Sequence, residues 1–154
     1  MRNKMRDKAV RGFKRYLSEE IAIEYKACLY FFAILFFYCV CLIWNGTYSA
    51  RILHMAEMIL ATYCMGYIQV YGLHNFDEAE KLSGREAASM ISCTALYTAS
   101  SFLFGWFGQN MAVTGIFFCY VLFMYWCAYL VNKIKRNIDT ENLNKMLKKF
   151  KEAD

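Results

Sequence analysis

Four long runs of apolar residues, separated by short polar stretches, dominate the pattern along the chain. They cover residues 27–44, 52–70, 87–107 and 111–131. A helix needs about 20 residues to cross the hydrocarbon core of a bilayer, within a range of about 17 to 25. Each run meets that length. The pattern therefore predicts an all-α integral membrane four-helix bundle over residues 27–131, flanked by polar segments at residues 1–26 and 132–154.

The two flanking segments are basic and carry apolar residues at helical spacing. In the first, Val10, Phe13 and Leu17 recur every three or four residues. In the second, Asp139 or Thr140 is a good N-cap, and an apolar face follows, formed by Leu143, Met146, Leu147 and Phe150. We expect an amphipathic basic helix at each end. Each either lies on the membrane surface, which is the simpler interpretation, or docks into a groove of a protein partner.

The composition favours a membrane protein over other classes. Of the 154 residues 58% are hydrophobic, and the absence of proline leaves long helices uninterrupted. The formal net charge of +5 does not indicate nucleic-acid binding, because the basic residues lie beside the apolar runs, where they contact anionic lipid. All seven cysteines fall inside the runs, which is typical of packing residues and argues against disulfides or zinc. We expect no metal and no cofactor.

The distribution of Lys and Arg predicts the orientation in the membrane. Eight lie in residues 1–26, two in the connector at residues 73–86 and seven in the tail, whereas the two short loops on the other side hold only Arg51. Basic residues collect on the cytoplasmic side of membrane helices. Both termini and the connector are therefore predicted to be cytoplasmic in a multi-pass protein of the cell membrane.

The second run carries the one ionisable group that lies well inside an apolar stretch. Arg51, His54 and Glu57 are three residues apart, so they lie along one side of a helix. Charged residues inside a membrane usually face the protein interior and mark functional sites. The favoured interpretation is a structural ion-pair cluster, and the alternative is a site that senses or binds a proton or ligand. His-x-x-Glu alone is too few ligands for a metal site, and His74 lies at the opposite end of the run.

The third run is rich in small residues. Ala88, Ser92, Ala95 and Ala99 lie at offsets of four, three and four, and small residues let membrane helices approach closely. We expect this face to pack centrally, against the face that carries Glu57. Ser and Thr hydroxyls of the same run would then hydrogen-bond the Glu57 carboxylate.

The architecture resembles a family of small bacterial membrane proteins of unknown function that are encoded beside LytTR-type transcription regulators. The resemblance is carried by the connector HNFDEAEKL at residues 74–82 and the tail LNKMLKKFKE at residues 143–152. It implies a membrane protein that restrains or tunes a cytoplasmic DNA-binding regulator. It implies no catalytic residues.

These observations predict a regulatory or sensory binding protein and no enzyme, since no catalytic or nucleotide-binding motif occurs. Besides the lipid bilayer, the expected partner is the cytoplasmic regulator. It would be held by the N-terminal helix, by Asp77 and Glu78 of the connector, and by the apolar face of the tail. The alternative is a small oligomeric transporter or channel subunit that uses Glu57, with further copies of the chain as partners. An intramembrane enzyme is a third, weaker alternative.

Overall fold

The computed structural model describes the backbone of residues 2–73 and 75–153, and the side chains within these ranges except those of residues 2–9, 15, 150, 152 and 153. This part of the chain is helical and contains no strand. Its α-helices are α1 (Arg2–Trp44), α2 (Ile52–Tyr67), α3 (Gly84–Leu103) and α4 (Met111–Ala153). The prediction of an all-α fold is confirmed. Two of these helices, α1 from Val10 to Trp44 and α4 from Met111 to Lys149, are long and apolar enough to cross a membrane.

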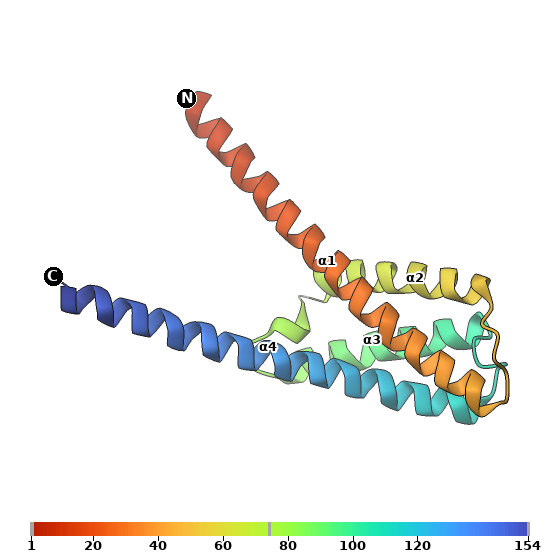
Figure 1. The fold of residues 1–154 in the computed structure, drawn as a ribbon. Helices are drawn as coiled ribbons and strands as arrows, with labels where there is room; N and C mark the ends of the chain where they lie inside the picture. Colours follow the sequence, from red (N-terminus) through yellow and green to blue (C-terminus); the bar gives the residue numbers. More distant parts are fainter. Residues whose placement is uncertain (1, 74, 154) are drawn as a thin grey trace.

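The helices pack as two antiparallel pairs, α1 with α2 and α3 with α4, and α2 also contacts α3. Figure 1 shows the loops at residues 45–51 and 104–110 together at one end, here called the loop end. The segment that joins α2 to α3 lies toward the opposite end, here called the terminal end, from which both chain termini project. Each of the four predicted spans lies mainly within one of the four α-helices.

The core is built from aromatic and aliphatic side chains at four-residue spacing. On α1 the inward positions are Tyr30, Ile34 and Tyr38, and on α4 they include Phe117 and Tyr125. The rings of Tyr30 and Tyr125 lie 4.9 Å apart between centroids, so α1 and α4 meet through their side chains. A four-residue repeat keeps side chains on one face of a helix, and that face is the buried one.

Both long helices continue through the predicted boundaries of the flanking segments. α1 is unbroken across residue 27, and α4 is unbroken across residue 132. The N-cap predicted at Asp139 or Thr140 is wrong, because no glycine or proline interrupts the residues before it and the helical hydrogen bonds simply continue. The basic segments are therefore continuations of α1 and α4, and their outer parts project beyond the packed helices (Figure 1).

The connector between α2 and α3 is more compact than expected. α2 passes into a π-helical turn at Ile68–Gly72, and a single 3₁₀ turn, η2 (Phe76–Glu78), follows. In the sequence, Asn75 or Asp77 is suited to cap a short interfacial helix that would run through Leu82. This prediction is wrong, because η2 ends at Glu78. Asn75 adopts a left-handed conformation with φ of 53°, which turns the chain so that Phe76 is buried against Tyr125.

Helix α3 starts directly after Ser83. The Ser83 hydroxyl donates to the Glu86 carboxylate, and this bond lowers the pKa of Glu86. Because Glu86 lies in the first turn, its ionised form also faces the positive end of the helix dipole.

The small-residue face of α3 does not pack centrally. Ala88, Ser92, Ala95 and Ala99 are all exposed, and the buried face is formed by Met90, Cys93, Thr94, Tyr97 and Ser101. The expected packing of this face against Glu57 is therefore wrong. The physical reason is that the large rings of α1 and α4 fill the centre of the bundle. They leave no room there for the small-residue face of α3 to make close backbone contacts.

Candidate functional site

Glu57 lies in a small hydrogen-bonded cluster at the loop end. Its Oε2 atom is 2.9 Å from Nδ1 of His54, one turn earlier on α2. The same oxygen accepts a hydrogen bond of 3.1 Å from the indole Nε1 of Trp106. His54 is buried, Glu57 is half-buried, and the ring of Tyr38 on α1 meets the His54 ring edge-on at 6.1 Å. The Glu57 cluster, defined as His54, Glu57 and Trp106, thus joins α2 to the α3–α4 loop.

Two of the three residues predicted for this site are brought together. His54 and Glu57 touch, as their spacing suggested, but Arg51 is exposed at the start of α2, and no ion pair joins it to Glu57 within the described residues. Trp106 was missed because it comes from a loop 49 residues away. The loop residues on either side of it, Gly105 and Gly108, both adopt positive φ. This backbone turns Trp106 inward, and such a conformation favours glycine.

The hydroxyls of α3 do not reach Glu57. Thr94 and Thr98 donate to backbone carbonyls one turn earlier, and Ser101 donates to the Thr98 carbonyl. A backbone carbonyl three or four residues earlier is the usual hydrogen-bond partner of a Ser or Thr hydroxyl inside a helix. The expected hydroxyl–Glu57 bond is therefore wrong, and the Trp106 indole takes its place.

A second charged cluster, at the terminal end, was not predicted. Lys26 of α1 places its Nζ 2.7 Å from Oδ1 of Asp77 and 3.3 Å from Oε1 of Glu78, and it also donates to the Asn75 side chain. The side chains of Lys26 and Asp77 are only 5% and 3% exposed. The signal was present in the sequence, because Lys26 lies four residues before Tyr30 and so shares the buried face of α1.

Helix α4 fixes the same turn from the other side. Asn132 donates to the Asp77 carbonyl at 3.1 Å, and Arg136 donates to the carbonyls of Glu78 and Ala79. Residues 77–79 are thus held between α1 and α4. Asp77, predicted to bind a partner, is buried and already paired, whereas the Glu78 side chain is 52% exposed.

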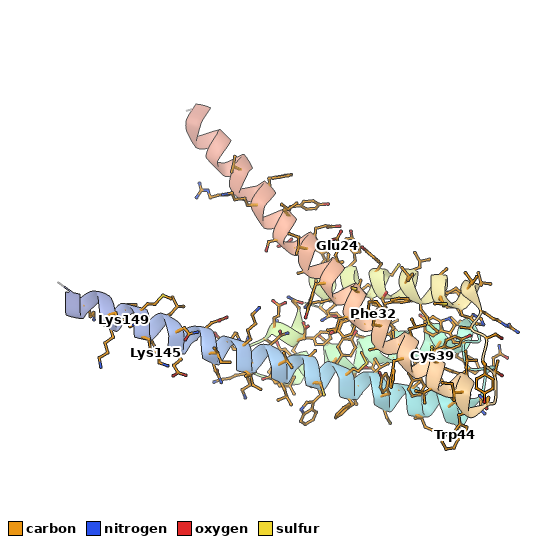
Figure 2. The ribbon with its side chains drawn as sticks, in the orientation of Figure 1. Glu24, Phe32, Cys39, Trp44, Lys145 and Lys149 are labelled. Atoms are coloured by element: carbon orange, nitrogen blue, oxygen red, sulfur yellow. The ribbon has the colours of Figure 1, made fainter. Side chains whose placement is uncertain are left out.

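The predicted partner-binding face of the tail lies apart from this cluster. Leu143, Met146 and Leu147 are 56–62% exposed on the projecting part of α4, and the side chain of Phe150 lies outside the described residues. Lys145 and Glu141 form an exposed pair one turn apart. Figure 2 shows Lys145 and Lys149 on this projecting segment, well away from the packed helices.

Neither cluster is arranged as a metal centre. In the part of the chain that the structure describes, no three His, Cys, Asp or Glu side chains are grouped to hold a metal ion. The seven cysteines, all described, are free thiols, and of these only Cys93 is buried.

No family model, curated protein or solved structure matches this chain. The resemblance to the four-span family beside LytTR-type regulators therefore stays a prediction. The function has to be inferred from the geometry of the chain itself.

Proposed function

We propose that this is a multi-pass membrane protein in which all four helices cross the bilayer. The exposed faces of the helices support this. Phe32, Phe36 and Phe123 are 62–66% exposed on the outer faces of α1 and α4, and Figure 2 labels Phe32 on the packed part of α1. Large exposed apolar patches are rare on soluble monomers. A lipid environment removes that cost, which is about 25 cal/mol per Å² in water.

The shorter helices also have the length that a bilayer requires. α3 has 20 residues, which corresponds to about 30 Å at a rise of 1.5 Å per residue. α2 and the π-helical turn after it cover residues 52–72, which is a similar length. The hydrocarbon core is about 30 Å thick. With 17 of the 18 Lys and Arg at the terminal end, the positive-inside rule makes that end cytoplasmic.

Within this membrane protein, we infer a regulatory or sensory binding role. The observation that carries it is the C-terminal arm, defined as residues 137–153 of α4. Every described side chain of this arm is exposed, and the arm combines lysines with the apolar face of Leu143, Met146 and Leu147. A helix with an unburied apolar face is the usual ligand for a groove on another protein. The resemblance implies that this partner is a LytTR-type DNA-binding regulator.

The two long helices offer a route for a signal. α1 and α4 each run without a break from the loop end into the projecting segments. Residues 77–79 connect them at the terminal end through Lys26, Asn132 and Arg136. A shift at the Glu57 cluster, which contacts Tyr38 of α1, would therefore move both projecting segments together, because unbroken helices transmit displacement as rigid elements.

The test is crosslinking and pull-down from native membranes at native expression. The intact protein is expected to recover a cytoplasmic DNA-binding protein, and a variant lacking Asn142–Asp154 is expected to lose at least nine-tenths of it. The triple variant L143Q/M146Q/L147Q should behave like the truncation, whereas the control K145Q/K149Q should retain the partner. Recovery of no cytoplasmic protein would contradict the regulatory role.

The half-buried Glu57 favours a second candidate, an oligomeric transporter or channel subunit. A carboxylate held by His54 and Trp106 at the loop end lies where an ion would enter the helices. Recovery of only further copies of the chain in the same pull-down would favour this candidate. Ion flux in proteoliposomes, compared between the native protein and E57Q, would then decide it.

A further inference from the structure

A cavity of about 490 Å³ lies between α1 and α4, on the side where the two helices diverge toward the terminal end. Its walls are mostly apolar and are formed by Leu29 and Ala33 of α1 and by Phe123, Met124, Cys127 and Ala128 of α4. This volume is within the range of small-molecule sites, about 300–1,000 Å³. Small side chains at Ala33, Cys127 and Ala128 create the hollow between rings that elsewhere fill the space.

The lining of the pocket differs between its two ends. Toward the loop end, the Tyr120 hydroxyl donates to the Ala33 carbonyl at 2.9 Å and Phe37 packs on the Tyr120 ring. Toward the terminal end, the lining changes to Lys26, Asp77, Glu78 and Asn132. An occupant therefore needs an apolar body with a single polar end that points to the terminal end.

A second pocket, of about 320 Å³, continues from that polar end. It shares Glu78 and Asn132 with the first pocket and adds Lys135, Arg136 and Asp139. Two cationic and two acidic side chains therefore surround it. A group that carries both a phosphate and an ammonium is complementary to such a mixed pocket, because each charge meets an opposite one.

The dimensions select the kind of apolar body. The lining runs from Ala22 to Ala33 on α1 and from Tyr120 to Asn132 on α4, a length of about 17 Å at 1.5 Å per residue. This is close to one leaflet of hydrocarbon, about 15 Å. An extended acyl chain of one leaflet therefore matches the length of this apolar lining.

We propose that this site binds one phospholipid of the cytoplasmic leaflet, with an acyl chain in the apolar cavity and a phosphoethanolamine headgroup in the mixed-charge pocket. The phosphate lies toward Lys135, beside the Arg136 guanidinium that already donates to the Glu78 and Ala79 carbonyls. The ammonium lies toward Asp139, beside the Glu78 carboxylate that also faces Lys26. The inference rests on the proposed membrane insertion, with the terminal end in the cytoplasm. The bound lipid fills the wedge between α1 and α4, directly beside the Lys26–Asp77 pair.

The experiment uses the full chain in nanodiscs of equal parts phosphatidylethanolamine and phosphatidylglycerol. Either lipid is doped in turn with a version that carries a diazirine on its acyl chain, and adducts are mapped by mass spectrometry after photolysis. The ethanolamine probe is expected to label residues 120–132 at least tenfold above the outer face of α3. Ala128→Phe fills the cavity and should lower that labelling at least tenfold. The matched control Ala99→Phe, on the exposed face of α3, should leave it unchanged.

Adducts spread evenly over the exposed faces of all four helices would overturn the site. Equal or stronger labelling of residues 120–132 by the glycerol probe would overturn the headgroup assignment. Both comparisons use the native chain, so they hold even if Ala128→Phe does not fold. Release of the native protein from membranes by alkaline carbonate, tested before photolysis, would instead refute the membrane insertion itself.

Discussion

Replacing Asp77 with alanine is expected to lower the free energy of unfolding by about 3–5 kcal/mol, the largest effect of any single charged residue in the described part of the chain. The substitution leaves the Lys26 ammonium buried without its closest charged partner, at a side chain that is only 5% exposed. Glu78, at 3.3 Å, and Asn75 compensate only in part. Denaturant unfolding of the purified protein in detergent, followed by circular dichroism, measures the change.

Two controls separate burial from charge. Glu141→Ala breaks the exposed pair with Lys145 and should change the unfolding free energy by no more than about 0.5 kcal/mol. The double variant K26M/D77L should recover most of the loss, because an apolar pair of similar volume replaces a buried ion pair at little cost. If Asp77→Ala were as mild as Glu141→Ala, the Lys26–Asp77 pair would not be a structural anchor.

Replacing Tyr125 with alanine is expected to cost about 3–5 kcal/mol, the usual range for truncating a buried ring. The Tyr125 ring is fully buried and contacts Tyr30, Phe76 and Tyr97, with centroids 4.9, 5.2 and 6.4 Å away. It therefore connects α4 to α1, to η2 and to α3. The same unfolding measurement applies.

The ring, and not the hydroxyl, should carry this effect. Among the described residues the Tyr125 hydroxyl makes no hydrogen bond of ordinary geometry, and its interaction with the Cys93 thiol is a weak one. Tyr125→Phe should therefore change the unfolding free energy by less than about 1 kcal/mol. Tyr48→Ala, at a tyrosine that is 89% exposed in the loop at residues 45–51, should be within about 0.5 kcal/mol of the native protein. A large loss for Tyr125→Phe would show that the hydroxyl has a partner that this account omits.

The sequence predicted what depends on local spacing. The apolar runs gave the helices, and the three-residue offset brought His54 and Glu57 into contact. The offset could not supply Trp106 or Asp77, because their contacts join residues 49 and 51 positions apart. Such contacts depend on how the helices pack, and the pattern of a single helix does not encode that.

Two wrong predictions, the inward face of α3 and the helix start at Asp139 or Thr140, have the same origin. Small residues at helical spacing on the third run suggested an interface, but the rings of Tyr30 and Tyr125 decided which face of α3 turns inward. Likewise, Asp139 and Thr140 have the right side chains for an N-cap, but a cap forms only where a helix begins. The preceding residues are already helical, so the tertiary context overrides the local signal.

The most direct test of the central claim, four membrane crossings with both termini cytoplasmic, is the topology of the full chain in its native membrane. An epitope is inserted after Thr47, Glu80 or Gln109, or added after Asp154, and its accessibility to antibody is measured on intact spheroplasts and on permeabilised ones. If all four helices cross the membrane, the epitopes at Thr47 and Gln109 will be accessible on intact spheroplasts, and those at Glu80 and Asp154 will become accessible only after permeabilisation. Accessibility of Thr47 and Glu80 from the same side would contradict it.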